Sequence, residues 1–271
     1  MALVPFPSGA PARRDPDDDP YEDGELDGTG GKMSFLEHLD ELRTRLIYSV
    51  YALIGGCLIS FIFVGRIQDF IMKPLYELMG NGEKLAYFAP GEGFMIMMKI
   101  GGLAGLFLAL PVIILQLWFF IAPGLYSNEK RFVIPFVTLG TFFFVAGAAF
   151  SHYVAFPYTW KFFGGFETEY MKFVPNASQA LSMWMLMLLA FAVIFQMPTI
   201  VFFLSRMGVV SARFLIRHFK YAVLIIFVLG AVLSPGTDVM SQLIMAGPML
   251  VLYGLSILIA AIFGKRKPKE D

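Results

Sequence analysis

Phe132 to Phe156 read FVIPFVTLGTFFFVAGAAFSHYVAF, a stretch in which His152 is the only side chain of the Asp, Glu, Lys, Arg and His types. A bilayer core is about 30 Å thick and is crossed by roughly 20 apolar residues in helical form. The stretch is long enough to cross, and helices of soluble proteins are rarely apolar on every side. It therefore predicts a membrane-spanning helix.

Five further apolar segments set the fold class. Hydrophobic residues make up 57% of the chain and charged residues 15%, and the charges are bunched between the apolar runs. We therefore predict an all-α, polytopic membrane protein with six transmembrane helices. The other spans are expected at Leu46–Val64, Phe94–Ala122, Ala177–Ser205, Tyr221–Leu233 and Val239–Phe263. The fifth span is short, about 20 Å of helix at 1.5 Å per residue, unless it extends back through Phe214.

The 21 Lys and Arg side chains are distributed unevenly over the connecting segments. Fifteen lie in the two tails, in the loop with Lys130 and Arg131, and in the stretch Arg206–Lys220, whereas six lie at the other ends of the spans. Positive charge favours the cytoplasmic side of a membrane. We therefore expect both termini in the cytoplasm, and the loops Arg66–Gly93 and Pro157–Asn176 on the outer side of an inner membrane.

Two tails are expected to flank a membrane domain at residues 33–264. Residues 1–32 are rich in Pro, Gly and acidic side chains, a composition typical of disordered segments. Their Arg13-Arg14 pair precedes acidic residues instead of an apolar run, so we do not interpret it as an export signal. Residues 265–271 form a short basic tail, expected in the cytoplasm.

Charge and cysteine content exclude several classes of function. The formal net charge is zero, which gives no overall basic field for nucleic acid. Cys57 is the only cysteine, so the chain cannot form an intramolecular disulfide or a cysteine cluster for zinc or iron and sulfur. We expect no cofactor.

The segment before the first span, residues 34–45, is predicted to be an amphipathic helix at the cytoplasmic interface. It opens with Ser34 and Glu37 in the spacing of a capping box. One face is apolar and the other polar, as expected of a helix lying on a membrane surface. Glu41 has two interpretations, an i,i+4 pair with Arg45 or a binding carboxylate, and spacing alone favours the ion pair.

A second polar segment, Gln116–Arg131, follows the second span. Pro123 and Gly124 end one helix, and Glu129 is expected in the first turn of the next, where the helix dipole favours a carboxylate whatever its function. Phe120 alone would be an ordinary lipid-facing or packed aromatic side chain.

Prolines at 111, 135, 198 and 248 fall within the spans. Each removes a backbone donor, and we expect kinks that curve the bundle, with a moving hinge as the alternative.

The two polar segments resemble the TatC family, the receptor subunit for twin-arginine signal peptides. His38-Leu-Asp-Glu-Leu-Arg-Thr-Arg45 is similar to its N-terminal motif, and Gln116–Arg131 is similar to its first cytoplasmic loop. The resemblance continues through Phe156-Pro157 and Leu233–Asp238 and covers about residues 33–264. It implies a concave, kinked bundle in a multimeric complex of the inner membrane. It also implies a non-enzymatic receptor that binds the signal peptides of folded precursors and recruits TatB-like and TatA-like subunits for export driven by the proton gradient.

Residue by residue, the resemblance implicates Glu41, Glu129, Phe120 and Arg43 in binding the signal peptide. The chemistry agrees, because two guanidinium groups are best bound by two carboxylates that accept forked, charge-assisted hydrogen bonds. Lysine, a point charge, should substitute poorly for arginine. The resemblance also assigns structural or loop positions to Pro74, Pro111, Tyr126, Pro198, Asp238 and Pro248.

Gln196 departs from the family, which commonly carries a glutamate in the fourth helix a few residues before the proline. Glutamine keeps hydrogen bonding but cannot change charge. Polar groups in apolar helices usually face protein, and we expect Gln196 to contact a partner helix, with internal packing as the alternative.

Two other classes of function remain as alternatives. An ion-coupled small-molecule transporter usually has ionisable residues near the membrane midplane, and the interior candidates here are only Gln196, Lys99 and His152. An intramembrane hydrolase fits less well, because the three histidines, His38, His152 and His218, have no metal-ligand spacing and there is no nucleophile elbow.

Overall fold

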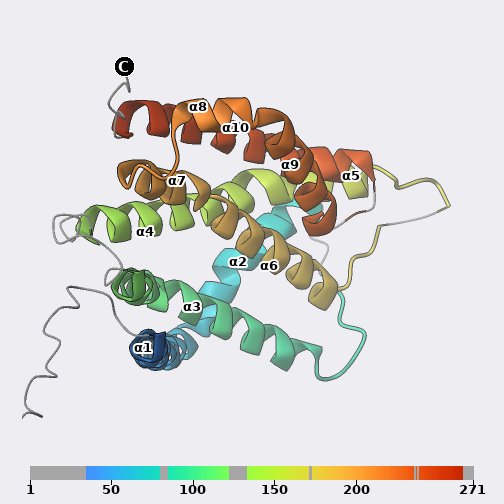
Figure 1. Cartoon of the computed structure of the whole chain (residues 1–271). Helices are drawn as coiled ribbons and strands as arrows, with labels where there is room; N and C mark the ends of the chain where they lie inside the picture. Colours follow the sequence, from blue (N-terminus) through green and yellow to red (C-terminus); the bar gives the residue numbers. More distant parts are fainter. Residues whose placement is uncertain are drawn as a thin grey trace, which may run out of the picture.

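The fold is an all-helical bundle (Figure 1). The computed structural model describes residues 35–79, 85–121, 133–170, 173–234, 236 and 238–264. Within them, the only β contact is an isolated parallel bridge between Ala86 and Asn176. Five helical stretches are long and apolar enough to cross a membrane, and the shorter apolar helix Phe219–Leu233 is the sixth. The predicted fold class is confirmed.

The elements follow one another as α1 (Phe35–Ile62), α2 (Val64–Met79), α3 (Glu92–Ile121), α4 (Val133–Phe150), a π-helix (Ser151–Ala155), α5 (Phe156–Gly164), α6 (Ala177–Ile194), α7 (Met197–Arg206), α8 (Ala212–Arg217), α9 (Phe219–Leu233) and α10 (Val239–Phe263). Helix α1 packs along α3, α4 packs on α6, and α10 packs on α7 and α9. On the left in Figure 1, α3 ends, α4 begins and α10 ends at the same end of the bundle.

Helices α1 and α3 approach closely because small residues line their crossing. A Cβ added to Gly105 would come within 2.5 to 2.7 Å of the Sγ, N and Cα atoms of Cys57. The buried hydroxyl of Ser60 donates to the carbonyl oxygen of Gly101 at 2.5 Å. Small side chains and such hydrogen bonds drive helix association where lipid removes the hydrophobic difference.

An aromatic cluster joins α3, α4 and α7 near the C-terminal end of α3. Trp118 is fully buried, and its ring centroid lies 4.9 Å from that of Phe136 and 4.8 Å from that of Phe203. Aromatic pairs at these distances favour tilted and edge-on arrangements. The cluster fixes the end of α3 that carries Phe120.

The third span is longer than predicted. We expected it to end at Phe156, before Pro157, but the helix continues through the π-helix and α5 to Gly164. Pro157 lies in the first turn of α5, where a missing N–H costs little. The π turn before it shifts the hydrogen-bond register, so the chain passes the proline without leaving the helix.

Helix α2 was missed, because we expected Arg66–Gly93 to be a loop. It has the period of an amphipathic helix, with the buried Ile71 and Met72 and the half-buried Ile67 toward the bundle. Pro74 falls within α2, and its side chain lies outside the described set.

Two spans are interrupted. The fourth breaks between α6 and α7 at Phe195 and Gln196, with Pro198 in the first turn of α7, because proline cannot donate to the preceding turn. The fifth does not extend back as one helix, because His218 leaves the helical conformation between α8 and α9. Pro111 and Pro248 instead lie inside uninterrupted helices, α3 and α10.

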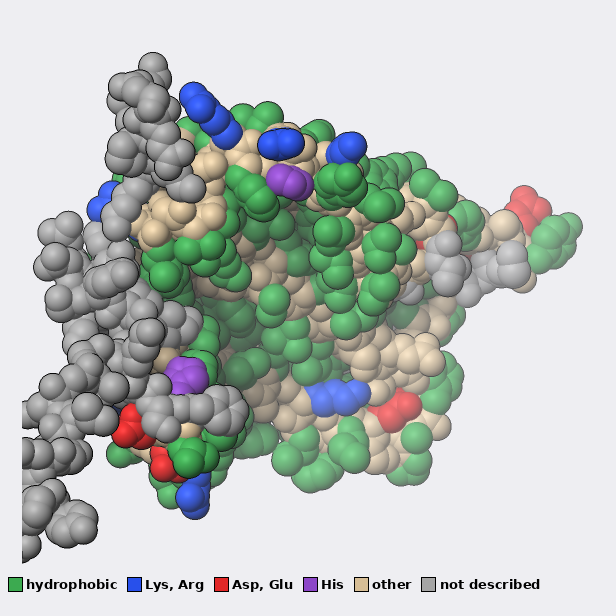
Figure 2. Space-filling model, viewed as in Figure 1, with side chains coloured by type: hydrophobic (Ala, Val, Ile, Leu, Met, Phe, Trp, Pro, Cys, Tyr) green, Lys and Arg blue, Asp and Glu red, His purple; other side chains and the backbone are tan. Residues whose placement is uncertain are grey.

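The surface is largely hydrophobic, as a lipid-facing bundle requires. Figure 2 shows hydrophobic side chains over much of the visible face, with charged side chains toward its margins and a basic and an acidic side chain near each other in its lower part. The middle of this face is hollowed.

Candidate functional site

One cluster of polar and aromatic side chains forms where α1 begins and α3 ends. Helix α1 contributes His38, Glu41 and Arg45, one turn apart on the same side of the helix. Helix α3 contributes side chains of its last two turns: Gln116, Phe119 and Phe120. We call these six residues the α1/α3 site.

Glu41 and Arg45 form the charged part of the site. Arg45 donates from Nη2 to Oε1 of Glu41 at 2.9 Å and from Nη1 to Oε1 of Gln116 at 3.5 Å. Its guanidinium carbon lies 5.0 Å from the ring centroid of Phe119. The i,i+4 ion pair favoured by spacing is therefore present, but it is also anchored to α3.

His38 and Phe120 form the aromatic part. Their rings stack at a centroid distance of 4.5 Å with an interplanar angle of 17°. Both side chains are half-buried, so each keeps a surface toward solvent. The stacked pair holds Phe120 against the same helix that carries Glu41.

Part of the polar face of α1 is turned inward toward α3, whereas we predicted a polar face at the membrane surface. Only 15% of the Glu41 side chain and 29% of the Arg45 side chain are exposed, whereas Leu42 and Leu46 point outward. Helix α1 also runs without a break from Phe35 into the span, because no Pro or Gly interrupts it before Gly55. The contacts with α3 outweigh the amphipathic preference of the segment alone.

The arrangement can hold a planar cation. A carboxylate, an amide oxygen and an aromatic ring surround one guanidinium group, and these are the partners that arginine prefers. The Arg45 Nε is buried and has no hydrogen-bond partner among the described residues. The site is therefore a guanidinium site that a side chain of the protein itself occupies.

The other predicted binding residues are placed as follows. Arg43 lies on α1 and is exposed. Glu129 and Tyr126 lie outside the described residues, as do Ser34 and the two tails.

Asp238 has a structural role at the start of α10. It accepts hydrogen bonds from the Ser241 hydroxyl and from the Ser241 N–H, both at 2.7 Å. These bonds hold the pKa of the Asp238 carboxyl below its ordinary value. The residue is an N-cap, which fits its predicted structural position.

Gln196 is engaged within the chain. Its amide nitrogen donates to the carbonyl oxygen of Gly140 on α4 at 3.0 Å and lies 3.5 Å from that of Ala192. The side chain is half-buried at the break between α6 and α7. The alternative expectation for Gln196, packing within the chain, therefore describes the contacts of its amide nitrogen.

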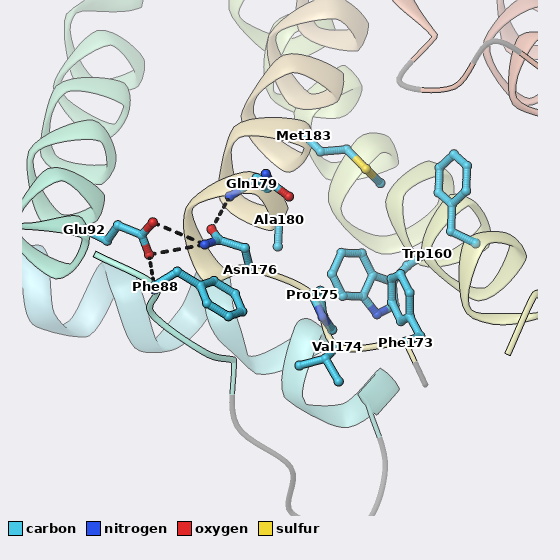
Figure 3. A pocket seen from close by; sticks show the side chains of 11 residues that line it. Phe88, Glu92, Trp160, Phe173, Val174, Pro175, Asn176, Gln179, Ala180 and Met183 are labelled. Atoms are coloured by element: carbon cyan, nitrogen blue, oxygen red, sulfur yellow. Dashed lines mark hydrogen bonds between the residues drawn. The ribbon is translucent and has the colours of Figure 1, made fainter. Parts of the chain in front are cut away.

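A second polar site, missed from the sequence, lies at the opposite end of α3 (Figure 3). Asn176 caps α6 by accepting from the backbone N–H of Ser178 and Gln179, and its amide donates to Glu92 at 3.2 and 3.3 Å. Phe88 donates its N–H to Glu92 at 3.0 Å. Beside the hydrogen-bonded pair Glu92–Asn176 is a cavity of about 640 Å³ with aromatic walls that include Trp160 and Phe173. The pairing joins the first residue of α3 to the N-cap of α6, which are far apart in sequence, so spacing could not indicate it.

No metal centre is indicated in the described part of the chain, where no group of three or more His, Cys, Asp or Glu side chains converges.

Comparison with known proteins gives consistent matches. The family model described as "Sec-independent protein translocase protein (TatC)" matches residues 37–248. The relative of that name from Desulforapulum autotrophicum is 41% identical over 240 residues, covering 89% of this chain and 88% of its own length. The relative from Helicobacter pylori is 40% identical over 236 residues, covering 86% and 89%.

Two solved structures also match over most of their length. A crystal structure of the twin-arginine translocase receptor TatC is 34% identical, with a TM-score of 0.72, over 83% of this chain and 98% of that one. A second crystal structure of that receptor, in DDM, has a TM-score of 0.73 at 34% identity, over 85% and 100%.

Proposed function

The chain belongs to the TatC family of Sec-independent protein translocase proteins, and from that premise we propose that it is the receptor for twin-arginine signal peptides of folded precursors. It binds the arginine pair at the α1/α3 site, with Glu41, Phe120, Arg43 and Glu129 as the contacting residues. The matches support this role and give no support to an ion-coupled small-molecule transporter.

One observation carries the proposal: Glu41 already binds a guanidinium group, that of Arg45, in a setting completed by Gln116 and Phe119. An incoming arginine would exchange one guanidinium partner of Glu41 for another of the same charge and geometry. It can therefore share Glu41 with Arg45, or displace Arg45, without leaving the carboxylate unpaired. Glu129 supplies the second carboxylate, which the second arginine requires.

The direct test is binding of a fluorescent twin-arginine peptide to the full chain in lipid nanodiscs. We expect saturable binding that a twin-lysine peptide of the same length competes for poorly, because lysine cannot form forked hydrogen bonds. Equal competition by the two peptides would contradict a guanidinium site.

We further propose that TatB-like and TatA-like subunits associate with the chain in a multimeric complex, and that the chain acts without cofactor or catalysis. Gln196 remains our candidate for a partner contact through its amide oxygen, because its nitrogen is already used toward Gly140. Such a hydrogen bond between helices contributes about 0.6–2 kcal/mol.

Gln196→Leu is therefore expected to weaken partner association roughly three- to thirtyfold at about 0.6–2 kcal/mol, and to leave peptide binding unchanged. Gln196→Glu, the residue that the family usually carries, should be tolerated as the neutral acid, which keeps a donor for the Gly140 carbonyl oxygen. A photocrosslinker at position 196, tested in resting and precursor-loaded membranes, measures the contact. Only intrachain or lipid adducts in both states would remove Gln196 from the interface.

The proposed orientation, with both termini in the cytoplasm of an inner membrane, follows from the basic residues. In a Cys57→Ala background, Tyr170→Cys should react with a membrane-impermeant thiol reagent added outside, because Tyr170 is 95% exposed in the loop after α5. Val209→Cys, 66% exposed between α7 and α8, should react only after the membrane is opened. The reverse pattern would invert the topology.

A further inference from the structure

An apolar cavity of about 560 Å³ lies between α1, α2, α3, α4, the π-helix after α4, and α6. Except for Ser60, His152 and Tyr153, its lining side chains are apolar. The Ser60 hydroxyl donates its hydrogen bond to the backbone carbonyl oxygen of Gly101 on α3. All of these elements except α2 belong to the predicted spans, so the cavity lies within the bilayer.

His152 places one polar donor in this wall. Trp184 donates its indole N–H to His152 Nδ1 at 3.1 Å. An indole N–H cannot accept, so Nδ1 must be the acceptor, and the proton of the neutral imidazole lies on Nε2. His152 is 4% exposed, Phe70 stacks on its ring at 5.0 Å, and Nε2 has no hydrogen-bond partner among the described residues.

The shape of the cavity limits its occupant. A helix with side chains is about 10–12 Å across, so 560 Å³ would hold only about 5–7 Å of one. Apolar cavities of this kind do not fill stably with water. The lining runs from Val145 to Tyr153, about 12 Å along the helix at 1.5 Å per residue. A flexible hydrocarbon chain with one acceptor at its polar end fits both the volume and the chemistry.

The level of His152 identifies which hydrocarbon chain this is. Lys130 and Arg131 directly precede the third span and mark one edge of the bilayer core near Ile134. His152 lies about 27 Å further along a helix that continues to Gly164, and therefore near the other edge of a core about 30 Å thick. The ester groups of phospholipids lie at that edge. Arg66 is an exposed cation one turn before Phe70 on the same side of α2.

We propose that this cavity binds one acyl chain of a bilayer phospholipid, with an ester carbonyl oxygen accepting the hydrogen bond of His152 Nε2–H and the phosphate facing Arg66. The lipid fills the space between α2 and the spans and holds α2 on the bundle. This site is distinct from the α1/α3 site and does not depend on the proposed receptor function.

Trp184 provides the probe, because it lines the cavity while only 3% of it is exposed. In a Trp118→Phe/Trp160→Phe background, the full chain is placed in nanodiscs of phospholipid brominated either near the ester or near the methyl end of the chain. Bromine quenches indole at short range. We expect stronger quenching from bromines near the ester, because Trp184 is bonded to His152 at that level.

Variants separate this lipid from bulk lipid. Ala104→Phe fills the cavity and should abolish the preferential quenching, while Ala261→Phe, exposed on α10, should preserve it. His152→Leu should lose the preference for the ester end and His152→Gln, which keeps a donor, should retain it. Should Ala104→Phe not fold, Ala104→Leu replaces it.

The proposal is overturned if brominated lipid quenches Trp184 fluorescence as strongly in Ala104→Phe as in its parent. It is equally overturned if bromines at the methyl end quench Trp184 more than bromines near the ester. It is also overturned if a photocrosslinker at position 145 yields adducts with a protein helix in place of lipid.

Discussion

The Glu41→Gln/Glu129→Gln double variant is expected to lose roughly 30-fold in affinity for a twin-arginine peptide, and each single variant about fivefold. A hydrogen bond to a charged group contributes about 1.5–3 kcal/mol when shielded. Screening by solvent and salt at a peptide-binding surface reduces this to about 1 kcal/mol for each carboxylate. Glutamine keeps the shape and one acceptor oxygen, so the loss reports charge and not packing.

The measurement is peptide affinity in nanodiscs, for twin-arginine and twin-lysine peptides side by side. Asp40→Asn is the matched control, because it removes the neighbouring charge from an exposed position of α1. We expect the control to change the affinity less than twofold, as for a screened surface charge. The double variant should lose its preference for arginine and keep its folding and membrane level.

Equal losses in the Asp40→Asn control would mean that the peptide responds only to the overall negative charge of this end. Unchanged affinity in the double variant would remove both carboxylates from the receptor site. In either result the family membership of the chain stands, and the location of the peptide site moves elsewhere.

The spans could be predicted because membrane crossing depends on length and composition, which are local properties. The stretch around Phe132–Phe156 needed no partner to be identified. Prediction failed at two places: α2 was taken for a loop although its amphipathic period is present in the sequence, and the helix that contains Pro157 was ended too early. A π turn and an interfacial helix both depend on the rest of the bundle for their stability.

The α1/α3 site shows the same division. Glu41 and Phe120 came from the resemblance to the family, and nothing in their spacing could show that they share a surface. The stacking of His38 on Phe120 and the bond from Arg45 to Gln116 cross between two spans. These contacts turned the polar face of α1 inward, against the amphipathic pattern of the segment alone.

The crossing of α1 and α3 holds that site together, and two glycines of α3 offer a matched test of it. A Cβ at Gly105 would meet the Cα of Cys57 at 2.6 Å and its N at 2.7 Å, atoms of backbone that cannot move aside. A Cβ at Gly102, less than one turn away, would meet nothing within 4 Å. The same substitution therefore tests close packing at one position and helix propensity at the other.

Gly105→Ala is expected to lower the free energy of unfolding by about 1–3 kcal/mol, the usual cost of overpacking a close contact. Gly102→Ala should raise it by about 0.5–1 kcal/mol, because alanine loses less backbone entropy in a helix. Unfolding of the purified protein in detergent, followed by Trp fluorescence, measures both. Because separation of α1 from α3 parts His38 from Phe120 and Arg45 from Gln116, Gly105→Ala should also weaken twin-arginine peptide binding while Gly102→Ala leaves it unchanged. If Gly105→Ala proved as stable as Gly102→Ala, the two helices would not be in close contact at this crossing, and the site would need another support.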